Sequence, residues 1–427
     1  MKEVLLINQF ASTPEMPGHT RQYETALGFV KEGWKVTVFA SDFNYTKREF
    51  LKLTGNKIFL KEQISSINWV WLRVFPYKIN NLKRIINLLS FCIILIFFTS
   101  KKLIKNYFLN NKKLIIIASS PQLPAAFFVM ILSKLFRRPF ILEIRDLWPQ
   151  VLIDNGKSPN SLFVKILSLM ELLSYKNSDA IVVLTKGVEK YIREKGGKNI
   201  YFLPNGADTE KFNFSELPKE DKNFNFKRPF LLIYPGAHGL ANDLSVLIEA
   251  ARILQHKPIQ FLLIGDGPEK RKLINQAQGL KNIQFKDPIS KKDMPLLLST
   301  SDAILLCLKD LPLFSYGVSP NKLYDAYSVG RPVVTNVSGL IKDEIENNKL
   351  GMTAKPGDAK DLANAIDSLR LTPREERVKM GQRGRMMAEK IYSRKKVNQD
   401  FHDLINSMTK KNLHVGYERS FFSKRNK

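Results

Sequence analysis

The chain contains little cysteine, little histidine and comparatively few acidic residues. Two cysteines and five histidines occur among 427 residues, and 40 Asp and Glu residues stand against 67 Lys and Arg, so the formal net charge is +27 at pH 7. Cys92 and Cys307 lie far apart in apolar runs, which predicts buried free thiols of a reducing compartment and no metal site. The strong positive charge predicts an anionic partner: nucleic acid, a lipid surface or a phosphate-rich substrate.

Several motifs are missing altogether. No Asp-x-Asp sequence occurs in the chain, so no obvious carboxylate motif would hold a divalent metal against phosphate groups. The lysines are dispersed and no RNA-binding or helix-turn-helix motif is present, which argues against nucleic acid as the anionic partner. The first residues run directly into a predicted strand, so we expect no signal peptide.

The remaining composition predicts two globular domains. Hydrophobic residues make up 44% and charged residues 25% of the chain. Each half begins with a strand, a loop, a helix and a second strand, first at residues 3–40 and again from residue 230 onward. This pattern predicts an α/β protein with two doubly wound, Rossmann-like domains that face a cleft. We expect an N-terminal domain over 1–212, a linker over 213–228, a C-terminal domain over 229–394, and a final helix with a basic tail over 395–427.

The most apolar run, residues 85–99, is flanked by cations. It is shorter than the roughly 20 residues that a spanning helix needs, so we favour a core helix with one lipid-facing side over a full span. The flanking cations are Lys83, Arg84, Lys101, Lys102 and Lys105. The tail at 410–427 is a second basic segment, either a lipid-contacting arm or a disordered end.

Residues 316–335 form the most informative stretch. Ser319 is a candidate N-cap, and Pro320 suits the first position of a short helix over 321–328. Gly330 fits a left-handed stop after that helix, and a strand follows.

The start of this short helix suits an anion. Gly317 and Val318 would let a phosphate approach the backbone, and the helix N-terminus supplies free N–H groups. Lys322 adds a cation, and Asp325 lies one turn later on the same face, where it could accept hydrogen bonds from a ribose. The alternative is an ordinary capped helix with a solvated Lys–Asp pair.

Other loops follow predicted strands and therefore lie on the ligand edge of a sheet. Gly18 and His19 follow the first strand; His19 is either a surface residue or, with Gly18, close to substrate. Arg145 and Asp146 follow a strand over 140–144, where Glu143 is either an inward-facing base or a carboxylate ligand. Arg145 and Asp146 could instead form a simple ion pair. In the second half, Gly265-Asp266-Gly267 follows a strand, which alone is weak evidence for a nucleotide loop.

The ordered set of motifs resembles the GT-B glycosyltransferases, and within them the retaining family-four group that builds bacterial surface polysaccharides. The motifs are PGHTRQYE at 17–24, EIRDLWP at 143–149, LPNGAD at 203–208, YPGAHGLAN at 234–242, IGDGP at 264–268 and SPNKLYDAYSVGRPVV at 319–334. The SPNKLYD and RDLWP variants are similar to the subgroup of L-fucosamine transferases. Together the motifs span nearly the whole chain.

The resemblance has departures. The family often carries two glutamates eight positions apart; Asp325 stands at the second, and Gly317 at the first. Its two cations in the second domain fall on Gly236-Ala237 and on Asn242-Asp243, so both are missing. Lys322 and backbone N–H groups would then have to balance the diphosphate.

The resemblance implies a hexosyltransferase-type enzyme. It would move an N-acetylated or deoxy-amino sugar from a nucleotide diphosphate, UDP, to a lipid-linked glycan acceptor in surface polysaccharide or O-antigen synthesis. Retention of anomeric configuration and independence of metals and cofactors are further implications, as is a location on the inner face of the cytoplasmic membrane with anionic lipid as a partner. The alternatives are a sugar-nucleotide epimerase or a phosphorylase on a similar scaffold, or a nucleic-acid-binding protein.

The expected site residues fall into three groups. Those expected to be catalytic are Gly18, Arg145, Asp146 and Lys322. Those expected to bind the donor are Gly236, Gly265, Gly267, Gly317, Val318, Asn321, Lys322 and Asp325. Those expected to bind the acceptor are His19, Arg21 and Asn205.

Overall fold

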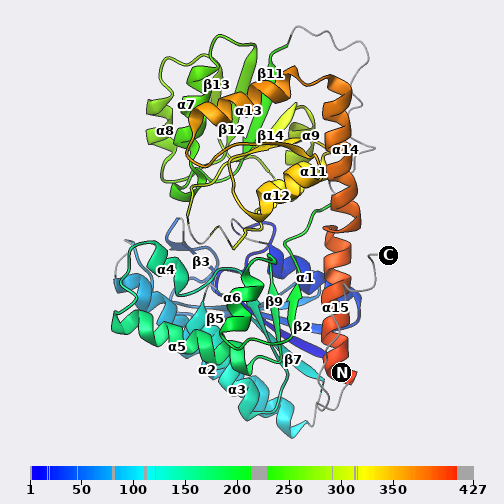
Figure 1. Ribbon diagram of the computed structural model, residues 1–427. Helices are drawn as coiled ribbons and strands as arrows, with labels where there is room; N and C mark the ends of the chain where they lie inside the picture. Colours follow the sequence, from blue (N-terminus) through cyan, green and yellow to red (C-terminus); the bar gives the residue numbers. More distant parts are fainter. Residues whose placement is uncertain are drawn as a thin grey trace. The chain divides into compact units, whose positions relative to one another are not determined.

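The computed structural model divides the chain into two compact units (Figure 1). It describes residues 2–16, 18, 20–45, 47–78, 82–109, 113–120, 122–210, 212, 228–290, 292–311, 314 and 316–410. The first unit holds residues 1–184, 188–203 and 398 onward, and the second holds 185–187 and 204–397. His19, nearly all of the predicted linker and the tail after Lys410 lie outside the described residues.

The first unit is built on an eight-stranded sheet in the order β10-β9-β8-β7-β1-β2-β6-β5. All neighbours pair in parallel except β5 with β6. The strands are β1 (Glu3–Ile7), β2 (Lys35–Ala40), β5 (Phe59–Ile64), β6 (Ile67–Leu72), β7 (Leu114–Ser120), β8 (Phe140–Ile144), β9 (Ala180–Val183) and β10 (Ile200–Phe202), with a small hairpin of β3 (Phe43–Asn44) and β4 (Glu49–Phe50). The strand order changes direction between β1 and β7, which is where such sheets bind ligands.

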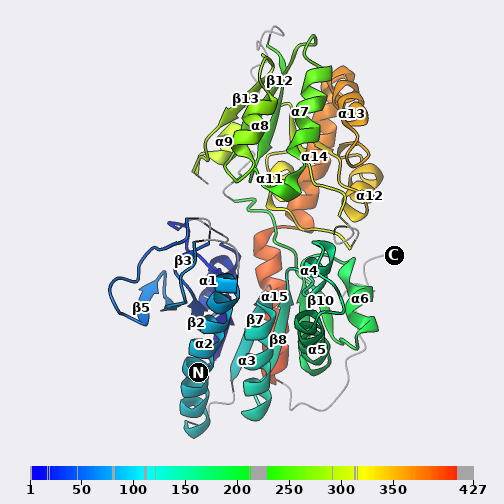
Figure 2. The same cartoon turned by 90° about the vertical axis from the view of Figure 1, so that its left-hand side faces the viewer.

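Helices cover both faces of this sheet. α2 (Leu82–Phe108), α3 (Leu123–Leu135) and α5 (Leu162–Asn177) lie side by side on one face, as Figure 2 shows. α1 (Arg21–Lys31) and α15 (Arg394–Lys410) lie on the other, where the Phe29 and Phe401 rings meet edge to face at 5.2 Å. α4 (Gln150–Asp154) and α6 (Val188–Glu194) complete the unit.

Two features of this unit differ from the sequence-based expectation. The apolar run at 85–99 is the middle of α2, which is 27 residues long. The helix continues past the apolar run because Leu103 and Asn106 are buried in the first unit, while the lysines around them have good helical propensity. The part of α15 from Asn398 onward belongs to the first unit, whereas the chain leaves that unit at Leu203, before the expected boundary at residue 212.

The second unit has a parallel sheet in the order β13-β12-β11-β14-β15-β16. Its strands are β11 (Phe230–Pro235), β12 (Ile259–Ile264), β13 (Ile283–Lys286), β14 (Ala303–Leu306), β15 (Val333–Thr335) and β16 (Gly351–Thr353). The four central strands β11, β12, β14 and β15 are short runs rich in Leu, Ile and Val and are almost entirely buried, as a parallel sheet covered on both faces requires. The chain winds outward from β11 through β12 on one side and starts again at β14 on the other, so the change of direction lies between β11 and β14.

Two helix layers enclose this second sheet. α8 (Lys270–Gln276), α7 (Leu244–Ile253) and α13 (Ala359–Leu371) pack in sequence on one face and share a core with the strands. α9 (Met294–Ser299), α11 (Asn321–Ser328), α12 (Leu340–Asn347) and α14 (Arg374–Lys390) form the rest of the covering. Both sheets therefore have the doubly wound, parallel architecture that the sequence predicts, and this prediction is confirmed.

Candidate functional site

The best-defined candidate site lies at the switch point of the second sheet. Tyr234 is on β11, and Cys307 follows β14 directly, so the two flank the point where the strand order reverses. Lys322 reaches this point from the first turn of α11. Its Nζ donates to the Tyr234 hydroxyl at 2.6 Å and to Asn242 Oδ1 at 3.4 Å, and it lies 3.9 Å from the centroid of the Tyr234 ring.

Burial of the Lys322 ammonium changes its acidity. Removal from water lowers the pKa of Lys322 to about 7, because the neutral amine tolerates burial better than the cation. Burial also raises the pKa of the Cys307 thiol to about 12 and raises that of the Tyr234 phenol. The cluster therefore contains one group, Lys322, whose charge changes near neutral pH.

Two glycine loops bring backbone close to this lysine. A Cβ on Gly236 would lie 2.9 Å from Lys322 Nζ, so only glycine leaves the ammonium in its position. A Cβ on Gly265 would lie 1.8 Å from the carbonyl oxygen of Gly236, which fixes the close packing of the loops after β11 and β12. Lys270 adds a second cation here: its Nζ donates to the Gly265 carbonyl at 2.9 Å and pairs with Asp287 at 2.6 Å.

His238 lies in the first of these loops and is fully buried. Its backbone N–H donates to Asp266 O at 2.9 Å, and Gly267 packs on its carbonyl group. Neither ring nitrogen has a hydrogen-bond partner among the described residues. Burial, together with the nearby Lys270 charge, lowers the pKa of His238 to about 4, so the ring is neutral at pH 7.

The helix start that the sequence singled out differs in detail. Pro320, not Ser319, is the N-cap of α11, with extended backbone (φ −76°, ψ 128°). The Ser319 hydroxyl instead contacts the Tyr324 hydroxyl at 2.8 Å and accepts from the Asn205 N–H at 3.3 Å. Both cap assignments were one position too early, because Pro320 itself has extended backbone and the helical residues begin only at Asn321. Gly330 does adopt the left-handed conformation, at φ +63°.

The remaining predicted donor residues lie around this helix start. Asn321 is the first residue of α11 and is exposed, and Asp325 is partly buried one turn later. Gly317 (φ +86°) and Val318 precede the helix and are also partly buried. Asn205, expected to bind the acceptor, donates from Nδ2 to the Ser319 carbonyl at 2.7 Å, so in the structure it holds the segment before α11.

In the first unit, the residues near the β1/β7 switch point form a buried ion pair. Arg21 Nε donates to Glu143 Oε1 at 2.8 Å, and an Arg21 Nη donates to the Leu203 carbonyl at 2.8 Å. Gln22 and the Ser119 hydroxyl donate to the other carboxylate oxygen at 3.1 and 2.6 Å. Burial would raise the pKa of Glu143, but the Arg21 and Arg145 charges and the Ser119 hydrogen bond lower it below its usual value. Glu143 is therefore a paired, ionised carboxylate and not an accessible base.

Arg145 and Asp146 lie next to this ion pair. Arg145 Nη1 donates to Gln22 Oε1 at 3.3 Å, and its backbone N–H donates to the Ser120 hydroxyl at 3.2 Å. Asp146 is exposed, and its carbonyl accepts from the same hydroxyl at 3.0 Å. The Arg145 guanidinium thus faces the network around Glu143, and the alternative of a simple ion pair with Asp146 is not what the structure shows.

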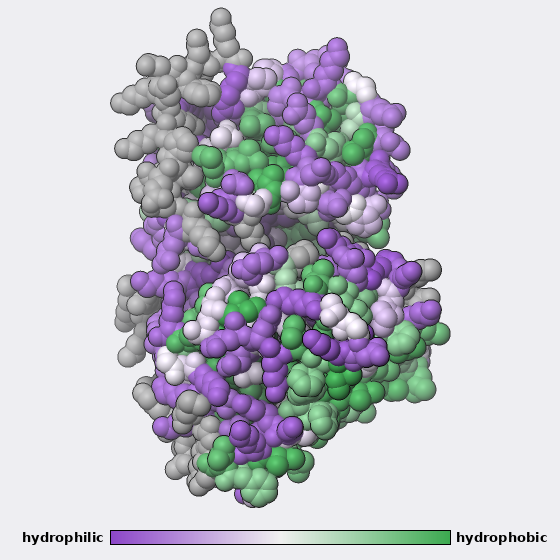
Figure 3. Space-filling view, turned by 180° about the vertical axis from the view of Figure 1, so that it is seen from behind, coloured by the Kyte–Doolittle hydropathy of each residue, from purple (hydrophilic) through white to green (hydrophobic). Residues whose placement is uncertain are grey.

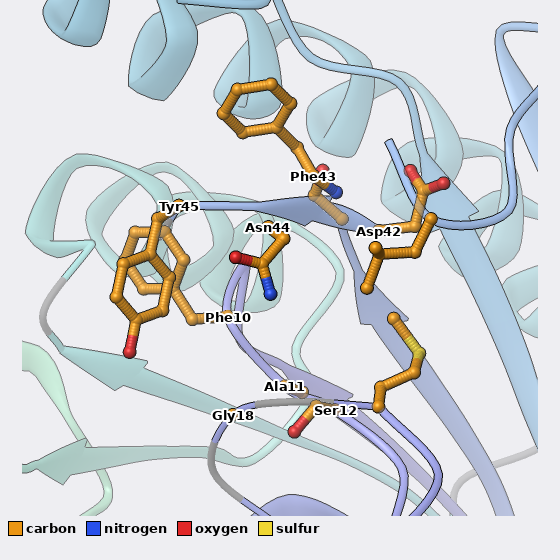
Figure 4. A pocket seen from close by; sticks show the side chains of 11 residues that line it. Phe10, Ala11, Ser12, Gly18, Asp42, Phe43, Asn44 and Tyr45 are labelled. Carbon is orange, nitrogen blue, oxygen red and sulfur yellow. Dashed lines mark hydrogen bonds between the residues drawn. The ribbon is translucent and has the colours of Figure 1, made fainter. Parts of the chain in front are cut away.

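A pocket adjoins Gly18 at the carboxyl ends of β1 and β2 (Figure 4). Its lining consists of Phe10, Ala11, Ser12, Met16, Gly18, Ser41, Asp42, Phe43, Asn44, Tyr45 and Leu51. A Cβ on Gly18 would lie 2.9 Å from Ser12 Oγ. Asp42 is buried and uses one carboxylate oxygen to accept from the Lys52 and Leu53 N–H groups at 2.8 and 2.6 Å. Neither Arg145 nor Asp146 lines this pocket, so the structure does not join them to Gly18 in one pocket.

Within the described ranges, no three His, Cys, Asp or Glu side chains are grouped so that they could hold a metal ion. Cys92 and Cys307 are both free and buried, as expected from their apolar surroundings.

The chain is similar in sequence to known glycosyltransferases. Residues 217–387 match the family described as "Glycosyl transferases group 1". WcaI of Escherichia coli K12, a glycosyl transferase assigned to colanic acid biosynthesis, is 24% identical over 289 residues, which cover 63% of this chain and 67% of WcaI. The amylovoran biosynthesis glycosyltransferase AmsK of Erwinia amylovora is 29% identical over 184 residues, 40% of this chain and 44% of AmsK.

Solved structures show the same fold over nearly the full length. Sucrose-phosphate synthase of Thermosynechococcus elongatus aligns with a TM-score of 0.72 and 17% identity, covering 96% of this chain and 99% of that one. HepE of Anabaena in complex with UDP aligns with a TM-score of 0.65 and 16% identity, covering 95% of this chain and 100% of HepE.

The protein is therefore a glycosyltransferase with the GT-B fold. Residues 217–387, which lie in the second unit, are the part of the chain that is similar to that family.

The sequence analysis assigned no role in the site to Tyr234, His238, Asn242, Cys307 or Lys270. Tyr234, Asn242 and His238 stand within the YPGAHGLAN motif, so their place after the first strand of the domain was available as a signal. Nothing in the sequence pattern indicated that Cys307 or Lys270 would meet the same loops, because strand order in a sheet follows from topology and not from sequence separation.

Proposed function

We propose that this glycosyltransferase moves an N-acetylated or deoxy-amino sugar from a UDP donor to a lipid-linked glycan during bacterial surface polysaccharide or O-antigen synthesis. The observation that carries the proposal is the Lys322 ammonium at the β11/β14 switch point, within reach of the Gly236 loop. Open α/β sheets bind ligands at this point, and a buried cation beside glycine backbone suits a diphosphate. The similarity to WcaI and AmsK, both assigned to exopolysaccharide synthesis, supports the acceptor class.

Sugar transfer requires stabilisation of the leaving group, the nucleoside diphosphate. The acceptor hydroxyl forms a bond to the anomeric carbon while the bond from that carbon to the diphosphate breaks, and the hydroxyl proton leaves with the departing diphosphate. Negative charge grows on the diphosphate during this step, so the Lys322 ammonium, kept protonated by the bound diphosphate, stabilises the transition state more than the ground state. Asp325 is proposed to accept hydrogen bonds from the ribose, and retention at the anomeric carbon and independence of metals are part of the proposal.

The first unit is proposed to bind the acceptor through the pocket beside Gly18. This pocket combines aromatic rings, Phe10 and Tyr45, with polar groups such as Asn44, a mixture that suits a sugar. The roles first assigned to Arg21 and Asn205 are less well supported, since both side chains already hold structural partners. An acceptor with a polyprenyl tail stays in the bilayer, so we propose that the enzyme works on the cytoplasmic face of the membrane.

A screen of sugar nucleotides for thermal stabilisation tests the donor. A ligand at 100 times its Kd stabilises a protein by about 2.7 kcal/mol, so a true donor raises the Tm measurably. We expect UDP-linked sugars to stabilise the protein and GDP-linked sugars to leave the Tm unchanged. Stabilisation by GDP-linked sugars alone would overturn the UDP assignment. Sugar transfer from the best-binding donor to a lipid extract then tests the acceptor class. The same assay in the presence of a chelator tests whether transfer is independent of metals.

A further inference from the structure

The helix layer formed by α2, α3 and α5 carries an unusual exposed surface. On α2, Leu82, Ile86, Ile93, Phe97 and Ile104 are all exposed, and Ile93 and Phe97 expose 69% and 63% of their surface. Their spacing of four or seven residues places them along a single stripe of the helix. α3 packs between α2 and α5, and both α3 and α5 add to the surface, with Leu135 of α3 72% and Leu162 of α5 74% exposed. Figure 3 shows a broad hydrophobic area in the lower half of the view.

The opposite side of α2 is anchored in the first unit by polar contacts at both ends. Near its start, Asn87 accepts from Gln9 Nε2 at 2.7 Å and donates to the Phe75 carbonyl at 2.6 Å. Near its end, Asn106 donates to Glu3 at 3.4 Å. These anchors are about 28 Å apart along the helix axis, at 1.5 Å per residue. α2 is long and apolar enough to cross a membrane by length and composition alone, but 28% of its apolar window is buried in the unit. Crossing a bilayer would break both anchors and expose unpaired polar groups to lipid.

The charge on these three helices has one sign. α2 and α3 contain no Asp or Glu, and the one acid of α5, Glu171, is buried in an ion pair with Lys195 at 2.5 Å. The exposed cations include Arg84, Lys101 and Lys105 on α2 and Lys165 on α5. Lys102, which the sequence placed among the lipid-facing cations, instead pairs with buried Glu3 at 2.6 Å. Two copies of such a face would repel each other, whereas an anionic lipid surface complements it.

We propose that the α2/α3/α5 face docks onto an anionic membrane, with the three helices lying in the interface and none of them spanning it. The apolar stripe enters the boundary between headgroups and acyl chains, and the cations at its edge meet lipid phosphates. This inference rests on the membrane location proposed above, and it names the surface and its lipid partner. Vesicle binding needs neither donor nor acceptor, so its outcome is separate from the outcome of the transfer assays.

Sedimentation with vesicles tests the docking face. The full chain should pellet with vesicles that contain phosphatidylglycerol, bind pure phosphatidylcholine vesicles far less, and be released in part by high salt. Two variants test the two parts of the face. Ile93→Glu with Phe97→Glu disrupts the apolar stripe, and Arg84→Gln with Lys101→Gln and Lys105→Gln removes the cations. Each should lower partitioning about tenfold or more. A matched control, Lys281→Gln with Lys360→Gln and Lys390→Gln, removes the same charge from exposed positions of the second unit and should keep most of the binding.

Three outcomes would overturn the proposal. Equal loss in the control variant would mean that net charge alone drives binding. Failure to bind anionic vesicles, with self-association that Ile93→Glu abolishes, would assign the face to a second copy of the chain. Resistance to alkaline extraction, with release only by detergent, would make α2 a spanning helix. Because all the substituted side chains are exposed, circular dichroism and Tm should match those of the unmodified protein, which separates lost binding from lost folding.

Discussion

Lys322 and Tyr234 form a cation–π pair and a hydrogen bond at the same time: the ammonium lies 3.9 Å from the ring centroid and 2.6 Å from the hydroxyl. The Tyr234 hydroxyl donates a hydrogen bond to the Ala237 carbonyl at 2.9 Å, so one tyrosine connects the lysine to the glycine loop. The arrangement holds the Lys322 side chain in place before any ligand arrives, which reduces the entropy lost when a diphosphate binds.

Replacement of Lys322 by methionine should lower turnover by about two orders of magnitude or more. Methionine keeps most of the side-chain volume against Tyr234 but removes the charge that balances the departing diphosphate, a contribution of several kcal/mol in the transition state. Steady-state kinetics with the donor found in the screen measures the change, and an unchanged Tm serves as the control for folding. Near-normal turnover would show that Lys322 has only a structural role.

Donor binding should take up a proton at Lys322. The pKa of this amine is about 7 in the unliganded protein, and a bound diphosphate raises it by favouring the cation. Above pH 7 the free protein is mostly neutral at this position, so affinity for UDP should fall by up to tenfold per pH unit as the pH rises. The neighbouring Cys307 and His238 do not interfere, since their pKa values are about 12 and about 4.

Calorimetry in two buffers of different ionisation enthalpy measures this proton uptake. In the Lys322→Met variant, any protons taken up or released on binding come from UDP and other groups. This variant should therefore lack the proton uptake that we assign to Lys322. An affinity that is flat between pH 6.5 and 8.5 (about the range in which a group of pKa near 7 changes charge) would contradict the prediction.

Acidification should destabilise the second unit through His238. Its pKa is about 4 in the folded protein and near 6.5 when unfolded, so the unfolded chain binds the proton more readily. The stabilising contribution is fully present above pH 6.5 and is lost as the pH falls toward 4, by about 2 kcal/mol between pH 7.5 and pH 5. Urea unfolding at both pH values, with His238→Leu for comparison, measures it. Equal acid sensitivity in both proteins would exclude this histidine as the source.

The Arg21–Glu143 pair should behave as a structural unit. Arg21→Met leaves a buried, unpaired carboxylate and should cost about 3–5 kcal/mol of stability, whereas Arg21→Met combined with Glu143→Gln should recover part of that loss. Denaturant unfolding of Arg21→Met, Glu143→Gln and the double variant gives the interaction free energy between the two side chains. A stable Arg21→Met protein with weakened acceptor binding would instead restore the role that the sequence suggested for Arg21.

Asp325→Ala should weaken nucleotide binding with little effect on the fold. The carboxylate is proposed to accept hydrogen bonds from ribose hydroxyls, and a charged acceptor of this kind contributes about 1.5–3 kcal/mol. Asp325→Glu should be tolerated better, because it keeps the carboxylate. Calorimetry measures the affinity of both variants for UDP. Unchanged affinity in Asp325→Ala would show that this carboxylate does not bind the ribose.

The fold was predictable from sequence because its signals are local. Buried runs of Ile, Val and Leu separated by amphipathic helices specify parallel, doubly wound sheets, and glycines such as Gly236 and Gly265 mark where those strands end. The helix at 321–328 was also expected at its observed bounds, although its cap was assigned one residue too early.

The chemistry of the site was less predictable because it depends on contacts between distant segments. Lys322 was expected either to bind phosphate or to form a solvated pair with Asp325, but neither interpretation included its hydrogen bond to Tyr234, 88 residues earlier, or the burial that lowers its pKa. Arg21 was expected to bind an acceptor, but its partner Glu143 is 122 residues away and buried with it. Neither pairing leaves a periodic pattern in the sequence, since both follow from how β-strands are ordered in the sheets.

The C-terminal helix has a consequence for the order of events during synthesis. The first unit is discontinuous: α1 begins to find its packing partner only when Phe401 and its neighbours on α15 have been made. Domains usually fold in the order in which they leave the ribosome. Here the sheet of the first unit can form early, while one of its faces waits for the last helix, so the second unit can complete its fold before the first. A nascent chain stopped before residue 398 would then present the apolar surface around Phe29 to chaperones.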